Sequence, residues 1–467
     1  MLNTQSQSSR AGLLRQLGFF SAVALVISNM VGTGIFTTTG FMAGELGSAK
    51  LILACWLVGA LFAFAGALSY SELGINFPSS GGEYVYLTRA FGPEWGFMTG
   101  WVSFFAGFSA PIAATALAFS DYLGHVFGAL SIERPGMVIG SGWFSLRLGP
   151  GQLAASSLIA LFTVLNCFGV GRAAKVQNVL TGTKLVVLTG FVLLGFTAGT
   201  GSWSHFSHPA VRSTSSGLAA SFGVELLWVM FAYSGWNAAT YVAEEVRRPE
   251  RTLPVAIAAG TALVAALFMA LNLVFIYSTP LEQMKGEVAV GSLAATNLFG
   301  GHVAGAFSML MALALVATVN AEVTVGPRVY YAMAKNRAFF RAAGEVHPRW
   351  HTPVMAIMSQ GLCAMLMTLS PFRELILYIG MSLTLFTVLS VASLFVFRRS
   401  RQDWQKLRPV SFAWPLVPAS YIAVGTCMMV YGVWQRPRPS LTAFATVGIG
   451  ALVYHFGIRR RQNEPHD

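Results

Sequence analysis

The sequence predicts an all-α integral membrane protein in which two of about twelve membrane-spanning helices are broken. Its 467 residues are 55% hydrophobic and only 10% charged, whereas an average soluble protein has about 25% charged residues. Apolar runs of about 20 residues recur along the chain, and each is long enough to cross the hydrocarbon core of a bilayer. Two of these runs contain glycine-rich interruptions, which indicate a binding site in the membrane rather than simple spanning helices.

The spans are expected where apolar residues continue without a charge. We place them at about 17–42, 48–75, 95–120, 153–170, 178–199, 218–242, 254–278, 304–333, 353–370, 374–397, 412–434 and 440–458. The first run is too long and irregular for a cleaved signal peptide, and no small-residue cleavage site stands out in it. The loops at about 123–151 and 200–217 are rich in Gly and Ser. No soluble domain is expected.

Spans 1 and 6 carry the interruptions. Span 1 reads Val31-Gly32-Thr33-Gly34-Ile35-Phe36, and span 6 reads Phe231-Ala232-Tyr233-Ser234-Gly235-Trp236-Asn237. Glycine is a poor helix residue because its backbone loses the most freedom on folding. A repeat of five spans followed by five inverted spans would bring spans 1 and 6 into register. We therefore expect a cytoplasmic tail at 1–16, a transport core at 17–400, and helices 11 and 12 with a cytoplasmic tail at 401–467.

The two breaks predict complementary halves of a small-molecule site. Unwinding at Gly32, Thr33 and Gly34 leaves backbone N–H groups at the start of the outer half-helix, where the positive end of its dipole suits a carboxylate. Near Phe231, Ala232 and Ser234 the free carbonyls suit an ammonium. Together these sites match the α-carboxylate and α-amine of an amino acid. Close helix packing is the alternative explanation for the glycines.

Several motifs resemble those of one transporter family. The segment 31–36 resembles the first-span signature of amino acid–polyamine–organocation transporters, with Thr33 where that signature usually has Ser. The segment 231–237, followed by Glu244-Glu245-Val246 and 249–254, resembles span 6 of their L-type branch. Further similar segments are 78–87, 172–185 and 328–334. The resemblance covers about residues 15–400 and implies the five-plus-five inverted repeat of the leucine-transporter (LeuT) fold.

The resemblance also implies roles for individual residues. The backbone at Thr33 and Gly34 would hold the substrate carboxylate, and the carbonyls of Phe231, Ala232 and Ser234 would hold its amine. The ring of Phe231 would close the site towards the outside, with ordinary core packing as its alternative role. Asn237 would couple the broken helix to the substrate.

Lys184 is the most informative charge within a span. A lysine in the body of a membrane helix is costly unless it has a partner, and it usually serves a function. In the L-type branch such a lysine occupies the sodium site of sodium-driven relatives, so its ammonium would replace the ion. Burial would also let it release a proton. The alternative is snorkelling to the cytoplasmic surface.

The placement of positive charge predicts the topology. The formal net charge is +12, and with a cytoplasmic N-terminus most Lys and Arg residues fall in inside loops, as the positive-inside rule requires. Both termini are then cytoplasmic. The basic loops are explained by orientation and contact with anionic lipid, so nucleic acid is not an expected partner.

Other chemistries lack support in the sequence. Cys55, Cys167, Cys363 and Cys427 all fall in apolar runs and are expected to be core residues. His and Glu do not cluster with metal-ligand spacing, and no Walker-type phosphate loop is present. We expect no metal, no cofactor and no enzymatic activity. The 123–151 loop has no cysteine, so the disulfide-linked heavy chain of animal L-type transporters is not expected.

The sequence thus predicts sodium-independent transport, by exchange, of neutral L-amino acids across a bacterial inner membrane. Neutrality is inferred from Ser234, Tyr233 and Asn237 at the breaks; Glu225 or Glu322 in the pocket would reverse it, and Glu322 could also pair with Arg328 or Lys184. Glu72, Glu244 and Glu245 are expected to hold the inner gate with loop arginines. Proton-coupled uptake, a non-transporting amino acid sensor and a channel remain alternatives.

Overall fold

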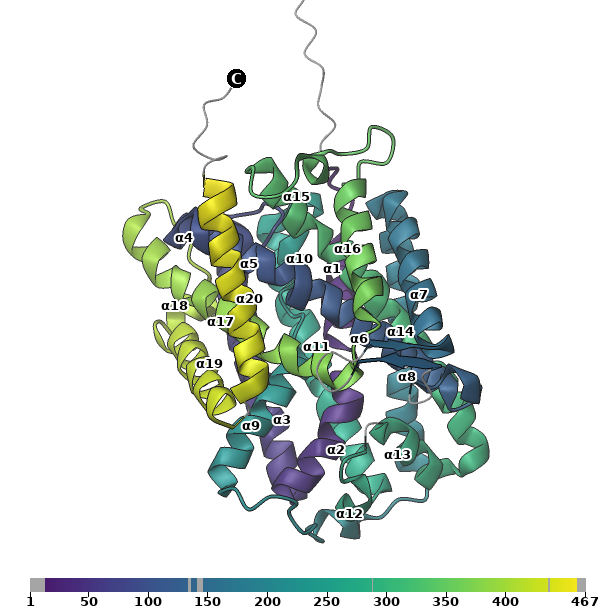
Figure 1. Ribbon diagram of the computed structural model, residues 1–467. Helices are drawn as coiled ribbons and strands as arrows, with labels where there is room; N and C mark the ends of the chain where they lie inside the picture. Colours follow the sequence, from purple (N-terminus) through teal and green to yellow (C-terminus); the bar gives the residue numbers. More distant parts are fainter. Residues whose placement is uncertain (1–12, 133–135, 141–145, 288, 436, 460–467) are drawn as a thin grey trace, which may run out of the picture.

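The computed structural model describes residues 13–132, 136–140, 146–287, 289–435 and 437–459. Most of these residues form helices that run roughly along one axis of the molecule (Figure 1). The expected all-α membrane class is confirmed, because ten helical segments of the described residues are long and apolar enough to cross a membrane.

The described residues of the first half of the chain form eight α-helices. They are α1 (Phe19–Met30), α2 (Gly34–Leu46), α3 (Ala49–Asn76), α4 (Glu83–Phe91), α5 (Pro93–Val102), α6 (Ala110–Gly124), α7 (Pro150–Cys167) and α8 (Val170–Thr197). Helices α1 and α2 together occupy predicted span 1. A π-helical segment at Ser103–Ser109 joins α5 to α6 within span 3.

The second half begins with the other broken span. Its helices are α9 (Leu218–Tyr233), α10 (Ala238–Tyr241), α11 (Pro249–Ser278), α12 (Leu281–Met284), α13 (Val290–Phe299), α14 (Gly301–Val325), α15 (Pro327–Lys335), α16 (Val354–Met367), α17 (Phe372–Ser400), α18 (Arg408–Phe412), α19 (Leu416–Gln435) and α20 (Pro437–Val453). Helices α9 and α16, which match predicted spans 6 and 9, are apolar but shorter than the ten full-length segments. The count of twelve spans therefore stays a prediction.

Helix pairing follows the order that a five-plus-five repeat requires. Helix α3 packs against α11, α6 against α14, and α7 against α16. In the predicted numbering these are spans 2 with 7, 3 with 8, and 4 with 9. Each partner thus lies five spans further along the chain, as in the leucine-transporter fold.

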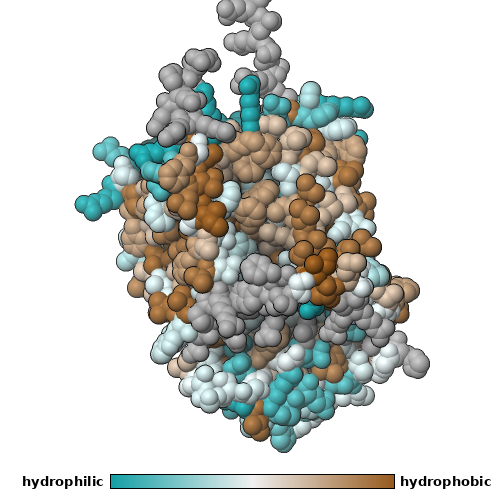
Figure 2. Space-filling view, in the orientation of Figure 1, coloured by the Kyte–Doolittle hydropathy of each residue, from teal (hydrophilic) through white to brown (hydrophobic). Residues whose placement is uncertain are grey.

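An apolar band crosses the visible face of the molecule between two polar ends. Figure 2 shows brown, hydrophobic residues across the middle of the visible face and teal residues near the top and bottom. Large apolar side chains on the outer helices are exposed, among them Leu61 of α3 and Val186 of α8. Their exposure fits contact with lipid tails rather than water.

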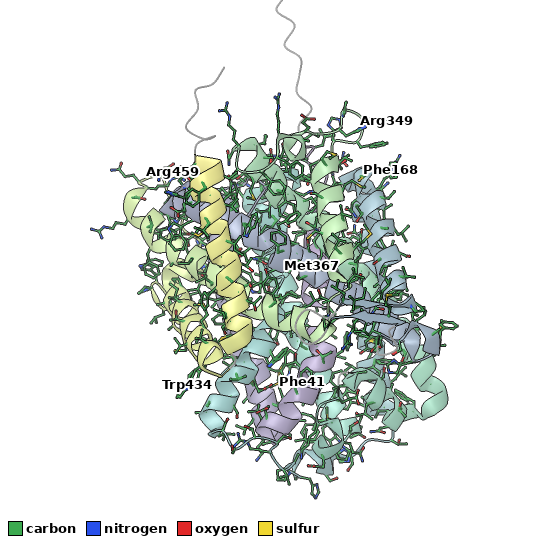
Figure 3. The ribbon with its side chains drawn as sticks, in the orientation of Figure 1. Phe41, Phe168, Arg349, Met367, Trp434 and Arg459 are labelled. Atoms are coloured by element: carbon green, nitrogen blue, oxygen red, sulfur yellow. The ribbon has the colours of Figure 1, made fainter. Side chains whose placement is uncertain are left out.

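Residues predicted on opposite sides of the membrane lie towards opposite ends of the molecule. Arg349 and Arg459, both expected inside, lie at one end of the molecule, and Trp434 lies towards the other (Figure 3). The segment before α1 joins the inner end as well, because Leu17 pairs in parallel with Val246 after the second break. Its N–H donates to Glu245 O at 2.9 Å.

Some local structure was not predicted. The loop at 123–151 contains a short antiparallel hairpin of β1 (Met137–Ile139) and β2 (Leu146–Leu148). The link between α11 and α14 contains α12 and α13, where only a loop was expected. All four cysteines were predicted to be core residues: Cys55 and Cys167 are buried, Cys363 on α16 is half-buried, and Cys427 on α19 is exposed, which corrects the prediction for that residue.

Candidate functional site

Both predicted breaks interrupt their helices. Helix α1 ends at Met30 and α2 begins at Gly34, so residues 31–33 leave the helical path. Helix α9 ends at Tyr233 and α10 begins at Ala238. Within the second break Gly235 has a φ of 99°, a conformation that side chains rarely permit.

The two breaks pack directly against each other. A Cβ atom added to Gly34 would lie 2.5 Å from Ala232 Cα, and one added to Gly235 would lie 2.6 Å from the carbonyl carbon of Asn29. Each break therefore contacts the end of the other span's first half-helix. Gly32 is less crowded, since its nearest neighbour would be Thr318 Cγ2 at 3.7 Å.

A pocket opens beside this contact. It encloses about 810 Å³, part of which is open to solvent, and spans 1, 2, 3, 6, 8, 10 and 11 contribute to its walls. Its lining residues are Asn29, Phe62, Glu83, Gly107, Phe108, Pro111, Met230, Phe231, Ser234, Gly235, Trp236, Asn237, Ala238, Tyr241, Glu322, Gly380, Leu383, Thr384, Thr387 and Tyr421.

The predicted substrate residues divide into two groups. Phe231, Ser234 and Asn237 line the pocket, so the second break faces it. The lining does not include the other four predicted residues, which are Gly32, Thr33, Gly34 and Ala232. Of these, Thr33, Gly34 and Ala232 are buried.

One predicted acceptor for the amine is already occupied. The carbonyl oxygen of Phe231 accepts from Ser234 N at 3.0 Å and from Ser234 Oγ at 2.7 Å. A carbonyl oxygen has two lone pairs, and these two bonds use both. The carbonyl of Phe231 is therefore satisfied by Ser234 within the second break itself.

Asn237 belongs to a buried hydrogen-bond network on the pocket wall. Its side-chain amide donates to Glu83 Oε1 at 3.1 Å and to the hydroxyl of Tyr241 at 3.0 Å. Tyr70 donates to the same Glu83 oxygen at 2.7 Å. Glu83 begins α4, which lies outside the candidate spans. Burial raises the pKa of its carboxyl group to about 7, although these hydrogen bonds lower that pKa. Glu83 was not among the predicted site residues, although it stands in the 78–87 motif.

Lys184 reaches the first break from α8. Its ammonium donates to Val31 O at 2.7 Å and to Thr318 Oγ1 at 2.7 Å. Thr318, on α14, also donates to Val31 O at 2.7 Å. The side chain is 1% exposed, so the lysine lies between spans 1 and 8 and does not snorkel to the surface.

More polar contacts continue from Lys184 along the same face of α8. Thr181, one turn before it, bonds to Ser28 Oγ of α1 at 2.8 Å. Gln177, one turn earlier, donates to Thr181 at 3.0 Å and accepts from Asn320 of α14 at 2.7 Å. These buried amides and hydroxyls hold α1 between α8 and α14. Three- and four-residue spacing places such residues on one helix face, which is the signal that the sequence offered for them.

Two buried ion pairs lie on the inner side of the site. Arg328 Nε of α15 lies 2.6 Å from Glu245 Oε1, just after the second break. Arg398 Nη2 of α17 lies 2.6 Å from Glu72 Oε2 of α3. The pairing of Glu72 follows the prediction. Glu245, however, pairs with Arg328 inside span 8 instead of a loop arginine, and among the described residues no ion pair joins Arg328 to Glu322.

The arrangement is that of a binding site for a small molecule. Among the described residues, no group of His, Cys, Asp and Glu could hold a metal ion. What the site offers is a pocket at two interrupted helices, lined by apolar and aromatic side chains with a few polar groups. Such pockets suit recognition of a small molecule.

Comparisons with known proteins give the family. Residues 17–452 match the amino acid permease family. The serine/threonine exchanger SteT of Bacillus subtilis is 27% identical over 97% of this chain and 98% of its own length. The mouse large neutral amino acids transporter small subunit 2 is 28% identical over 96% and 81%, and the mouse b(0,+)-type amino acid transporter 1 is 25% identical over 95% and 88%.

These matches extend over nearly the whole chain and agree with the helical membrane fold and its two broken spans. The chain therefore belongs to the amino acid permease family of the amino acid–polyamine–organocation superfamily, and it is an integral membrane transporter of amino acids rather than an enzyme.

Proposed function

We propose that this chain exchanges neutral L-amino acids across a bacterial cytoplasmic membrane, without sodium, by alternating access. The observation that carries the proposal is the placement of Lys184, whose ammonium bonds to the broken span 1 and to Thr318 of span 8. A fixed cation at this junction supplies the positive charge that a bound sodium ion would otherwise supply. The first break then keeps its shape without an ion.

The substrate would use both breaks. Its carboxylate would meet the backbone at Thr33 and Gly34, with Gly32 giving room for the turn. Its amine would meet the carbonyls of Ala232 and Ser234, because the Phe231 carbonyl is occupied by Ser234. Since Gly34 now contacts Ala232, the two breaks must separate slightly to admit both groups. The Phe231 ring, which lines the pocket, would act as the outer gate, and Asn237 would relay the movement to Glu83.

Neutral substrates are supported by the residues at the breaks and by two relatives. Ser234, Gly235 and Asn237 carry no charge, and an unpaired charge buried beside them would cost several kcal/mol. The relatives are named as an exchanger of serine and threonine and as a transporter of large neutral amino acids. Serine, alanine and leucine are therefore the first substrates to test.

We also propose that the chain works without a disulfide-linked heavy chain and has both termini in the cytoplasm. The loop at 123–151 carries no cysteine that could form such a link. We assign the transport core to residues 17–400 and a peripheral role to helices 11 and 12 with the tail at 401–467. The match to SteT supports a bacterial setting.

The decisive experiment is counterflow of labelled amino acid into proteoliposomes at fixed pH. We expect accumulation that depends on unlabelled amino acid inside and is unchanged when sodium is replaced by choline. Loss of uptake in choline would overturn sodium independence. Accumulation driven by a pH gradient without internal amino acid would support proton-coupled uptake, and binding without any flux would support a sensor.

A further inference from the structure

Glu322 is a buried acid without a hydrogen-bond partner at one of its oxygens. It lies on α14, is 8% exposed and forms part of the pocket wall. Its Oε2 atom is buried, and no described residue donates to it. A buried carboxylate oxygen normally has a donor, because leaving it unpaired costs the full desolvation penalty of the group.

Other buried acids of the chain do have direct partners. Glu72 and Glu245 form ion pairs with Arg398 and Arg328. Glu83 accepts hydrogen bonds from Tyr70 and Asn237. Glu322 Oε2 thus lacks the kind of donor that these three acids have.

The lysine that interacts with Glu322 forms its hydrogen bonds with other groups. Lys184 interacts with Glu322 electrostatically, but its hydrogen bonds go to Val31 O and to Thr318, one turn before Glu322 on α14. Among the described residues, Lys184 and Glu322 do not form an ion pair within 4.0 Å. The carboxylate thus faces a pocket that contains space but no bonded cation.

We propose that the carboxylate of Glu322 is a subsite for a positively charged substrate side chain, so that this pocket accepts cationic amino acids as well as neutral ones. The inference rests on the proposed function and extends it. The same pocket is lined by Ser234 of the second break and by Asn29 before the first. A substrate held there by its α-groups has Glu322 within the same cavity, and its terminal ammonium or guanidinium would supply the missing donor.

The charges of the surrounding groups favour this occupant. The pocket lining contains two acids, Glu83 and Glu322, and no Lys, Arg or His among the described residues. A substrate with one extra positive charge would offset part of this negative charge in a poorly solvated cavity, where charge balance matters most. A substrate with an acidic side chain would add a further negative charge.

The test is competition in proteoliposomes with the full-length protein. Counterflow of labelled serine is measured against unlabelled serine, lysine, ornithine and glutamate, in the wild type and in Glu322→Gln, Glu322→Asp and Glu225→Gln. We expect lysine and ornithine, but not glutamate, to inhibit the wild type. In Glu322→Gln the half-inhibitory concentration of lysine relative to that of serine should rise about tenfold or more, because a hydrogen bond to a charged group is lost.

The other two variants test whether the negative charge at position 322 is what favours lysine. Glu322→Asp keeps the negative charge and should retain part of the lysine inhibition. Glu225→Gln changes another buried acid, on α9 and outside the pocket lining, and should leave the lysine-to-serine ratio unchanged.

Three results would overturn the inference, and the first needs no variant to fold. If serine exchanges in the wild type but lysine and ornithine do not compete, the subsite is wrong and the proposed function stands. If Glu322→Gln alters the pH dependence of serine exchange but not the lysine-to-serine ratio, the residue carries a proton instead. If neither serine, alanine nor leucine exchanges, the proposed function fails and the inference fails with it.

Discussion

At the scale of single residues, the chain compensates the cost of a broken membrane helix with side chains from its neighbours. Val31 has its carbonyl released where α1 ends, and inside a bilayer such a group needs a partner. Lys184 and Thr318 both donate to it at 2.7 Å. At the other break, Ser234 donates twice to Phe231 O. Neither break therefore leaves these carbonyls exposed to lipid.

Replacing Lys184 tests whether its charge supports transport. Lys184→Met keeps the length of the side chain but removes the ammonium, so Val31 O retains only the bond from Thr318. We expect the rate of exchange to fall about tenfold or more, since a buried charged hydrogen bond contributes about 1.5–3 kcal/mol. Counterflow rates measured with equal amounts of monodisperse protein give the comparison, and Lys175→Met on the inner end of α8 is the control. Wild-type exchange by Lys184→Met would mean that the lysine only fills space.

The sequence allowed some of the residues of the site to be recognised and not others. Lys184 could be recognised because a charge inside an apolar run is rare and needs an explanation. Glu83 could not, since nothing in its own segment shows that Tyr70 and Asn237, which are 13 and 154 positions away, will bond to it. Glu322 was noticed as a charge within a span, but its position on the pocket wall depends on how α14 packs against its neighbours. Contacts between distant segments are what periodicity and composition do not contain.

At the scale of helices, the two breaks form one structural unit. The sequence predicted both interruptions, because Gly-Thr-Gly and Ser-Gly stand in the middle of long apolar runs. It explained the glycines by access to a substrate, whereas the structure gives them a second role as contact points. Gly34 lies against Ala232, and Gly235 lies against Asn29. Because these glycines have no side chain, each break leaves space for the backbone of the other span.

Two glycine-to-alanine substitutions can distinguish the effect of this contact on stability from the effect of helix propensity. Gly235→Ala would place a Cβ 2.6 Å from Asn29 at a residue with a φ of 99°, so steric overlap and backbone strain should both lower stability. We expect a clear drop in melting temperature and loss of exchange. The matched control is Gly190→Ala in α8, where a Cβ has no neighbour within 4 Å; this change should stabilise the helix by about 0.5–1 kcal/mol. Thermal unfolding of both purified variants in detergent is the measurement, and equal melting temperatures would contradict the packing role of Gly235.

At the scale of the whole molecule, composition alone was sufficient for the class of the protein but not for its local irregularities. Ten apolar helical segments and an apolar outer band follow directly from the runs in the sequence. The hairpin at 137–148, the helices α12 and α13 and the π-helical segment in span 3 do not, because each depends on packing at the ends or in the middle of neighbouring helices. The five-plus-five order, inferred only from the register of the two breaks, is now supported by helix pairs that lie five spans apart.

The orientation in the membrane is the property of the whole molecule that most needs a test. Most of the basic loop residues lie on the predicted inside, and that side includes Arg349 and Arg459 at one end of the structure (Figure 3). Arg251 at the start of α11 and Val211 before α9 are both exposed and lie on opposite predicted sides. In a background in which the four native cysteines are replaced, Val211→Cys should react with a membrane-impermeant maleimide in intact cells. Arg251→Cys should react only after the membrane is permeabilised, because the positive-inside rule keeps its loop in the cytoplasm. The reverse pattern would place the termini outside and invert the direction in which Phe231 gates the pocket.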